Sequence, residues 1–268
     1  MFKRLGIYLV IRNWSLGIFN AMTLLETKQL SKAFGGVQAV EGVSLAIEPG
    51  RIYSLIGPNG AGKTSFFNLL SGFLAPDKGE IFFRGEPITK LEPYERARHL
   101  SRTFQLTRNF RNLSLRDNLL LSFDSPFEHL SSFWRYRPAV EREQLGLIRE
   151  LLSELKFTRD LDAEGREISY GQAKLLELAR GILHHHELLM LDEPVGGVNP
   201  EIRGIIKAML QRLRQQGETV LLIEHDMNFV MDMSDYIFVM AEGKLIAEGE
   251  PDIIRKDPKV LEAYLGKE

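Results

Sequence analysis

Residues 57–64 read Gly-Pro-Asn-Gly-Ala-Gly-Lys-Thr and constrain the fold more than any other part of the chain. They satisfy the G-x-x-x-x-G-K-[ST] pattern, a glycine-rich loop whose backbone N–H groups turn inward around phosphate oxygens. Such a loop must follow a strand and open a helix. The flanking sequence supplies both, a short apolar strand over residues 51–56 and a helix over residues 64–70. The pattern predicts an α/β protein that binds a nucleoside triphosphate.

Each residue type in this loop has a chemical task. The Lys63 ammonium can reach the β- and γ-phosphates, and the Thr64 hydroxyl can bind Mg²⁺. The N-terminus of the following helix adds its positive dipole end. We therefore expect a nucleoside triphosphate and Mg²⁺ as ligands. The candidate nucleotide-contacting residues are Gly57, Pro58, Asn59, Gly60, Ala61, Gly62, Lys63, Thr64 and Ser65.

A second motif, Leu-Leu-Met-Leu-Asp-Glu at residues 188–193, is an apolar strand that ends in two carboxylates. Ligands collect at the carboxyl ends of parallel strands, so we expect these acids beside the phosphate loop. Asp192 is assigned to Mg²⁺, through water, and Glu193 to the attacking water. A glutamate with an ordinary pKa of about 4.3 is ionised at neutral pH but is a weak base. We therefore assign Glu193 more to positioning water than to removing its proton fully.

The composition is that of a globular protein and excludes several kinds of site. Of 268 residues, 44% are hydrophobic and 26% are charged, which suffices for a full core. The absence of cysteine excludes disulfides, Cys-ligated metals and thiol catalysis. A formal net charge of -2 removes the broad basic footprint of a dedicated nucleic-acid binder. The most apolar stretch, residues 5–25, contains Arg12 and several polar residues, so no membrane span is predicted.

Hydrophobic periodicity indicates a strand-rich core interrupted by a helical lobe. The pattern is helical from residue 93 to about residue 180, and the aromatic segment 126–138 is expected to pack this lobe. A further helix is predicted over 173–183. Between residues 139 and 156, apolar residues recur at steps of three and four and predict one buried stripe: Leu145, Ile148, Leu152 and Leu155. Strands are predicted at 24–30, 40–47, 51–56, 80–84, 188–191, 220–223, 236–240 and 244–248.

Residues 169–172, Ser-Tyr-Gly-Gln, stand just before the predicted helix 173–183 and between the two motifs above. A Ser and a Gly at a helix start form an anion-binding end. In this position they resemble the signature of ATP-binding-cassette (ABC) proteins, usually Ser-Gly-Gly-Gln, with Tyr170 in place of the first glycine. The resemblance implies that Ser169, Gly171 and Gln172 of one subunit cover the γ-phosphate held by another.

Other residues match landmarks of the same family in order along the chain. Phe34 is similar to the aromatic residue that stacks on adenine, and Gln105 to the glutamine that senses Mg²⁺ and the water. His225 is similar to the histidine that contacts the γ-phosphate. Residues 197–200 match the loop that crosses the dimer seam, although many members have Leu-Asp where this chain has Val-Asn.

The resemblance implies a particular fold and division of the chain. The fold class is α/β, a P-loop NTPase ABC cassette with a RecA-like mixed-sheet core, an antiparallel β subdomain and an inserted α-helical subdomain. Residues 1–22 are expected to be an extension, either an appendage or the product of a start upstream of Met22, and alternatively an amphipathic surface anchor. Residues 23–268 would form the ABC ATPase domain: 23–92 and 181–250 the nucleotide-binding core, 93–180 the helical subdomain with the signature, and 251–268 a C-terminal tail.

Within ABC proteins the chain is most similar to the ATPases of branched-chain amino acid importers. The supporting residues are 102–105, Tyr170, 199–200, 223–227 and 263–266. The resemblance implies an ATP-hydrolysing motor subunit of a bacterial importer, peripheral at the cytoplasmic face of the inner membrane. The expected partners are two permease subunits, a second ATPase chain (self or homologous) in a head-to-tail dimer, and a solute-binding protein, with no nucleic acid.

Several alternatives stay open at this point. A related amide or urea importer shares several of the subfamily features. A repair or translation ATPase of the same superfamily would carry zinc cysteines, long coiled coils or two cassettes, and none of these is present in the sequence. A phosphate-loop kinase would need an acceptor site and gives no reason for residues 169–172. A nucleotide-binding regulator would bind ATP without turnover.

Overall fold

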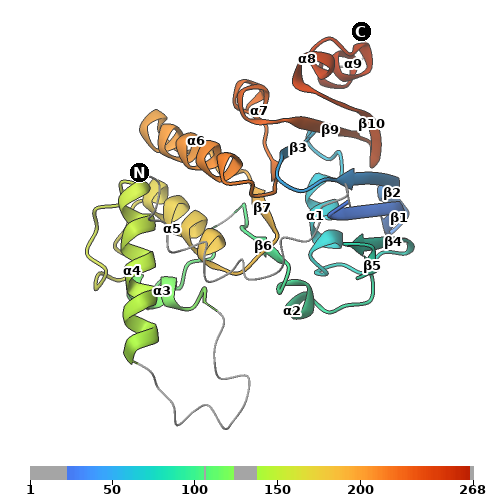
Figure 1. Cartoon of the computed structure of the whole chain (residues 1–268). Coiled ribbons are helices and arrows are strands. Elements are labelled where there is room, and N and C mark those ends of the chain that lie inside the picture. Colours follow the sequence, from blue (N-terminus) through green and yellow to red (C-terminus); the bar gives the residue numbers. More distant parts are fainter. Residues whose placement is uncertain (1–22, 106, 124–137, 266–268) are drawn as a thin grey trace. The chain divides into compact units, whose positions relative to one another are not determined.

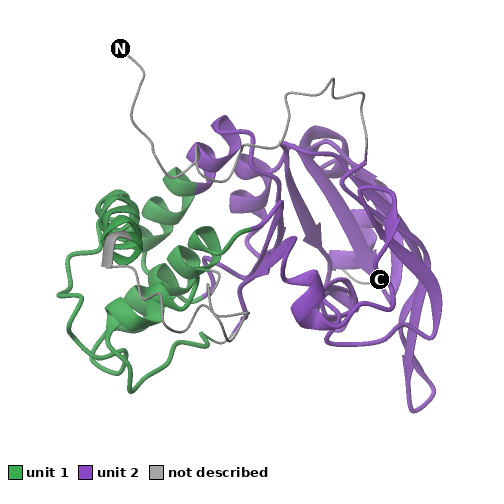
Figure 2. Cartoon of the chain, turned by 60° about the horizontal axis from the view of Figure 1, so that its bottom comes forward, with its two compact units in different colours: residues 1–20, 106–185, 197–209 green, residues 21–105, 186–196, 210–268 purple. Residues whose placement is uncertain are grey.

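The computed structural model describes residues 23–105, 107–123 and 138–265 (Figure 1). The described chain divides into two compact units (Figure 2). The larger unit contains the described residues of 21–105, 186–196 and 210–268, and the smaller unit contains those of 106–185 and 197–209. The expectations for residues 1–22 and for the aromatic segment before residue 138 concern residues outside the described ranges.

The larger unit is organised around a six-stranded sheet with the order β10-β9-β3-β8-β7-β6. All neighbours in it pair in parallel except β10, which runs antiparallel to β9. Its strands are β3 (Ile52–Ile56), β6 (Leu100–Arg102), β7 (Leu188–Asp192), β8 (Val220–Ile223), β9 (Tyr236–Ala241) and β10 (Lys244–Gly249). Parallel pairing brings the carboxyl ends of β3, β6, β7 and β8 to one edge, where the loops that follow them converge.

A second, antiparallel sheet in this unit has the order β2-β1-β4-β5. Its strands are β1 (Leu25–Phe34), β2 (Val37–Ile47), β4 (Lys78–Phe83) and β5 (Glu86–Pro87). One apolar core joins the two sheets to α1 (Lys63–Leu70), whose buried residues include Phe66, Phe67 and Leu70. Because α1 packs against both sheets, the loop that opens it is held from two sides.

Short helices complete the larger unit. A second cluster buries Ile56 and Val239 of the parallel sheet with residues of α7 (Met227–Met233), α8 (Pro251–Ile254) and α9 (Pro258–Leu265). The helix α2 (Pro93–Arg96) precedes β6. Figure 1 shows α7, α8 and α9 on the side of β9 away from β1 and β2.

The smaller unit is helical. It contains α3 (Leu115–Leu120), α4 (Pro138–Glu154), α5 (Tyr170–Leu183) and the first part of α6 (Pro200–Gln215) (Figure 2). The stripe predicted on α4 is confirmed, since Ile148, Leu152 and Leu155 are buried and Leu145 is half-buried. The 3.6-residue period therefore identified the packed face correctly.

The predicted strands are all present, with boundaries that differ by at most a few residues. One local prediction was wrong, and one predicted helix starts earlier than expected. The stretch expected to be helical from residue 93 contains the strand β6, which pairs with β7 and is too short to show a period of its own. The helix expected at 173 begins at Tyr170, because Ser169 and Gln172 form a capping box that starts the helix earlier.

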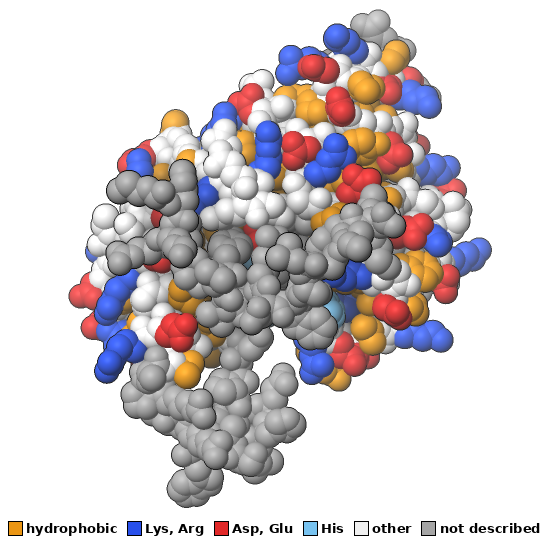
Figure 3. Space-filling model, viewed as in Figure 1, with side chains coloured by type: hydrophobic (Ala, Val, Ile, Leu, Met, Phe, Trp, Pro, Cys, Tyr) orange, Lys and Arg blue, Asp and Glu red, His pale blue; other side chains and the backbone are white. Residues whose placement is uncertain are grey.

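Within the described residues, no helix combines the length and the hydropathy needed to cross a bilayer. Acidic and basic side chains are interspersed over the described part of the face in Figure 3, in keeping with the near-zero net charge.

Candidate functional site

The phosphate loop after β3 is built on close backbone contacts that only glycine permits. Gly57 has φ 150°, and a Cβ atom there would lie 2.0 Å from the Met240 carbonyl oxygen. Gly62 has φ 97°, and a Cβ there would lie 2.1 Å from the Ala39 carbonyl oxygen. The loop therefore packs closely between β9 and β2, and these backbone contacts restrict its conformation in the absence of a ligand.

Lys63 is the first residue of α1 and places its ammonium inside the loop. Its Nζ donates to the carbonyl oxygens of Gly57, at 2.7 Å, and Pro58, at 3.0 Å. Burial lowers the pKa of Lys63, and the negative charges of Glu193 and Asp192 partly offset that effect. A buried cation bonded to the loop's own carbonyls is poised to exchange them for anionic oxygens.

The two acids at the end of β7 have separate surroundings. The Asp192 side chain is 3% exposed, and its Oδ2 lies 3.5 Å from Nη2 of Arg102. The Asp192 N–H donates to the Thr103 hydroxyl at 3.2 Å, which ties β7 to the end of β6. Glu193 follows with φ 49°, a backbone conformation in which a side chain is strained. The change of conformation separates a buried acid, Asp192, from a partly exposed one, Glu193.

Glu193 lies between two residues that are distant in the sequence. Its Oε2 accepts a hydrogen bond from Nε2 of Gln105 at 3.0 Å, and its Oε1 lies 2.8 Å from Nε2 of His225. Gln105 comes from the loop after β6, and His225 from the loop after β8. Three of the predicted site residues therefore meet at one carboxylate.

Glu224, which directly precedes His225, is a buried acid that binds the backbone of the loop after Glu193. It is 2% exposed, and its Oε1 accepts a hydrogen bond from the backbone N–H of Val195 at 2.9 Å. Burial raises its pKa, and hydrogen bonds from the Val195 and His225 backbones oppose that shift. Glu224 thus connects the loop after Glu193 to the loop that carries His225.

Phe34 lies at the end of β1 in the hairpin with β2 and is 45% exposed. The same hairpin contributes Ala39, whose carbonyl abuts Gly62 of the phosphate loop. An exposed aromatic ring on this hairpin is available to a flat ligand.

The signature residues lie in the smaller unit at the start of α5. The Ser169 hydroxyl accepts from the Gln172 N–H at 3.3 Å, and the Gln172 side chain accepts from the Ser169 N–H at 2.9 Å. Residues 169–172 line a hollow of about 620 Å³, together with Lys156 and residues 197–199. The Tyr170 ring packs against Gly197, so the residue that departs from the family pattern contacts the predicted seam loop.

The residues predicted to bind Mg²⁺, which come from α1, from the end of β7 and from the loop after β6, have donor atoms that fit this ion. Thr64, Asp192 and Gln105 offer hydroxyl, carboxylate and amide oxygens, which are the hard ligands that Mg²⁺ prefers. Thr64 and Gln105 are exposed, so both can reach a ligand that enters from solvent. These residues would hold the ion together with phosphate oxygens.

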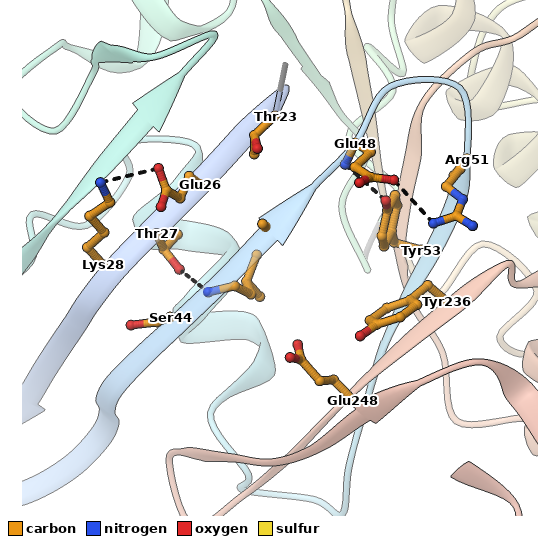
Figure 4. Close-up of a pocket in the computed structure, with 12 residues that line it drawn as sticks. Thr23, Glu26, Thr27, Lys28, Ser44, Glu48, Arg51, Tyr53, Tyr236 and Glu248 are labelled. Atoms are coloured by element: carbon orange, nitrogen blue, oxygen red, sulfur yellow. Dashed lines mark hydrogen bonds and ion pairs between the residues drawn. The ribbon is translucent and has the colours of Figure 1, made fainter. Parts of the chain in front are cut away.

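A second hollow, of about 460 Å³, lies on the larger unit between the two sheets (Figure 4). Its rim includes two ion pairs, Lys28 with Glu26 and Arg51 with Glu48, and the further acid Glu248. The paired charges neutralise one another, and none of the predicted site residues lines the hollow. We assign no part of the candidate site to it.

Sequence reasoning missed the supporting residues. Arg102 and Thr103 hold Asp192, and Glu224 holds the backbone at Val195. For Glu224 the available signal was position, since it stands just after the apolar strand β8, whereas Arg102 and Thr103 follow from β6, which the sequence did not reveal. Without the strand order, that position does not say which residue it faces.

The geometry is that of an ATP-binding cassette, and comparison with known families agrees. The family described as ABC transporter matches residues 40–196, and the chain belongs to that family as an ABC ATPase. A second family, described as Branched-chain amino acid ATP-binding cassette transporter, matches residues 244–268.

Two curated relatives refine the resemblance. The high-affinity branched-chain amino acid transport ATP-binding protein BraF of Pseudomonas aeruginosa is 40% identical over 91% of this chain and 98% of its own length. LivG, a protein of the same description from Escherichia coli K12, is 38% identical over 91% of this chain and 98% of its own length.

Solved structures show the same fold. A nucleotide-free ATP-binding cassette from an ABC transporter is 32% identical, with a TM-score of 0.78, and covers 92% of this chain and 100% of its own. The ADP conformation of another cassette is 34% identical, with a TM-score of 0.77 and the same coverage of both chains.

Proposed function

We propose that this chain is the ATPase subunit of a bacterial importer for branched-chain amino acids. It acts at the cytoplasmic face of the membrane with two permease subunits, a second ATPase chain and a solute-binding protein. The assignment of ATP hydrolysis to this chain is carried by one observation, the placement of Glu193 between Gln105 and His225. Glu193 lies at the edge of the parallel sheet where β3, the strand before the phosphate loop, also ends. The substrate class is supported by the relatives named above and by the family match at residues 244–268.

The larger unit binds the nucleotide. The loop amides of residues 57–65 and the Lys63 ammonium hold the phosphates, and Phe34 stacks on the base. Thr64, Asp192 and Gln105 hold Mg²⁺, which supplies charge neutralisation of the phosphates when bound. The glycine contacts described above support a preformed cradle, because such a loop binds without reorganising.

Glu193 orients the attacking water and accepts its proton as the water oxygen bonds to the γ-phosphorus. The bond between the γ-phosphorus and the bridging oxygen breaks at the same centre, so that ADP leaves and phosphate is formed. His225, 2.8 Å from Glu193, contacts the γ-phosphate and keeps the carboxylate aligned. Gln105 holds the other carboxylate oxygen, so a change in the Gln105 loop alters the placement of the base.

Ser169, Gly171 and Gln172 complete the site of a second chain. A capping serine with adjacent N–H groups at the start of a 14-residue helix favours an anion. Closure of the two chains on ATP and reopening after hydrolysis drive the permease between its two states.

The Glu193→Gln variant tests this function. The amide keeps the shape and removes the base, so we expect ATP binding to persist, turnover to fall by about 100-fold or more, and an ATP-bound dimer to accumulate. Size-exclusion chromatography with light scattering and a phosphate-release assay measure both effects. Equal turnover in the variant and the wild type would refute the assigned role.

The substrate class needs a separate experiment in cells. Deleting the gene for this chain should abolish uptake of labelled leucine, isoleucine and valine, and wild-type protein but not Glu193→Gln should restore it. Uptake of urea or an amide that depends on the chain instead would assign it to the related importer class.

A further inference from the structure

The Arg102 guanidinium contacts three parts of the larger unit. Its Nη1 donates to Oδ1 of Asn68 at 2.8 Å and to Oγ of Ser71 at 2.6 Å. Asn68 and Ser71 lie at the C-terminal end of α1, the helix that begins with Lys63 at the phosphate loop. Nη1 of the guanidinium is therefore fixed to the phosphate-binding helix.

The second terminal nitrogen of the guanidinium, Nη2, faces the end of β7. Nη2 of Arg102 lies 3.5 Å from Oδ2 of Asp192, and the two side chains are 5% and 3% exposed. At this depth a carboxylate needs a partner that keeps its charge, and an arginine stays protonated at any physiological pH. The Asp192 carboxylate thus faces a protein cation, while the Thr103 hydroxyl accepts from the Asp192 backbone N–H.

Aromatic rings surround the same guanidinium. The Arg102 guanidinium carbon lies 5.0 Å from the ring centroid of Phe104, 5.6 Å from that of Phe67 and 5.7 Å from that of Phe73. The Phe73 and Phe104 rings meet edge to face at 5.7 Å. Since Phe104 directly precedes Gln105, the stacking holds the start of the loop that presents the glutamine.

We propose that Arg102 is a positioning residue of the nucleotide site, which holds Asp192 and the Gln105 loop at a fixed position relative to α1. This inference rests on the proposed function, because it assumes that Asp192 and Gln105 bind Mg²⁺ beside ATP. Through these contacts Arg102 fixes the distance between the phosphate-binding helix and two of the metal-binding residues. Its loss should weaken binding of the metal more than binding of the phosphates.

The neighbouring Arg96 provides a matched control. Arg96 is 2% exposed and donates to the backbone carbonyls of Leu69, Leu70, Thr89 and Leu91. It contacts the same end of α1, but none of these four carbonyls belongs to a predicted metal-binding residue. A variant at this position reports loss of stability without disturbance of Asp192.

The experiment compares Arg102→Met, Arg102→Lys and Arg96→Met in the full chain. Binding of a fluorescent ATP analogue is measured first in excess EDTA and then as Mg²⁺ is added, with Mn²⁺ paramagnetic resonance as a direct metal probe. We expect the Mg²⁺ concentration at half-effect to rise about tenfold or more in Arg102→Met. In Arg102→Lys the Mg²⁺ concentration at half-effect should rise less, because the ammonium keeps the positive charge beside Asp192. It should still rise, because an ammonium cannot hold α1 and Asp192 together.

The controls separate the possible outcomes. Binding in EDTA should stay within about twofold of wild type in every folded variant, since Lys63 and the loop amides are unchanged. An unchanged Mg²⁺ midpoint in both Arg102 variants, or an equal rise in Arg96→Met, would overturn the inference. If Arg102→Met does not fold, Arg102→Lys decides alone. Wild-type protein that binds no analogue, with or without metal, would instead refute the proposed function.

Discussion

At the scale of single residues, the site depends on backbone conformations that side chains rarely adopt. Glu193 has φ 49°, which costs about 1 kcal/mol or more for a residue with a Cβ. Its N–H donates to the Ile223 carbonyl at 2.9 Å, and its carboxylate meets Gln105 and His225. These contacts hold a strained residue at the point where we place the chemistry, a common feature of active sites.

The phosphate-loop glycines differ in how strictly they are needed. A Cβ at Gly62 would lie 2.1 Å from a backbone oxygen, whereas at Gly60 (φ 79°) nothing lies within 4 Å. We expect Gly62→Ala to lower the free energy of unfolding by about 3 kcal/mol and to abolish ATP binding. Gly60→Ala should cost only the left-handed strain, about 1–2 kcal/mol. Urea denaturation checks both values, and equal losses would contradict the contact argument.

Glu224 predicts how stability depends on pH. Burial raises the pKa of this carboxyl above its ordinary value of 4.5. Between the ordinary and the raised pKa, the folded protein therefore keeps a proton on Glu224 that the unfolded chain has lost. The contribution of Glu224 to the free energy of unfolding therefore falls as pH rises from about 4.5 through the raised pKa. The Glu224→Gln variant removes this titration, and its amide oxygen can still accept the hydrogen bond from the Val195 N–H.

The measurement is urea denaturation of both proteins at about pH 4 and about pH 7. Wild type should lose more stability than Glu224→Gln across this interval. A parallel response of the two proteins would show that Glu224 has an ordinary pKa in the folded state.

At the scale of elements, α1 is held at its C-terminus by the buried Arg96 guanidinium. Its Nη1 donates to the carbonyls of Leu69 at 2.7 Å and Leu70 at 2.9 Å, in the last turn where helix carbonyls lose their regular partners. The Leu69 carbonyl also accepts from the Gly72 N–H at 3.3 Å. Arg96→Met should lower the free energy of unfolding by about 3 kcal/mol, because these acceptors lose charged donors in a dry site. Chemical denaturation measures the loss. A change below about 1 kcal/mol would mean that water replaces the guanidinium.

The N-terminus of α5 has two tasks that can be separated. Ser169→Ala removes the cap and should cost about 1 kcal/mol of stability. If Ser169 also contacts a partner's γ-phosphate, turnover should fall far more than the folded fraction does. Ser169→Thr keeps a hydroxyl and serves as the control. Turnover that follows stability in both variants would leave Ser169 as a cap alone.

At the scale of the whole molecule, the proposed head-to-tail pairing predicts complementation. Lys63→Ala damages the phosphate site but keeps the signature, and Ser169→Arg does the reverse. Each variant alone should be inactive, whereas a mixture forms dimers with one intact site and should recover ATPase activity. Gel filtration confirms that both variants are folded. No recovery from two folded variants would argue against a site shared between copies of this chain.

The sequence by itself determined the class of fold and the chemistry of the local motifs. The phosphate loop, the apolar strand ending in Asp192 and Glu193, and the stripe on α4 are contiguous or periodic signals, and short-range sterics and burial fix what they form. The strand β6 escaped this reasoning because three residues carry no period. The roles assigned to single site residues, and the boundaries of the predicted domains, stay predictions.

Only the tertiary structure decided which distant residues meet. Gln105 and His225 reach Glu193 because the parallel order β8-β7-β6 brings three strand ends to one edge. Arg102 reaches Asp192 for the same reason, and no pattern near residue 102 indicates a carboxylate as its partner. Local propensity acts over a few residues, whereas these contacts depend on strand order, which is set by the packing of the whole core.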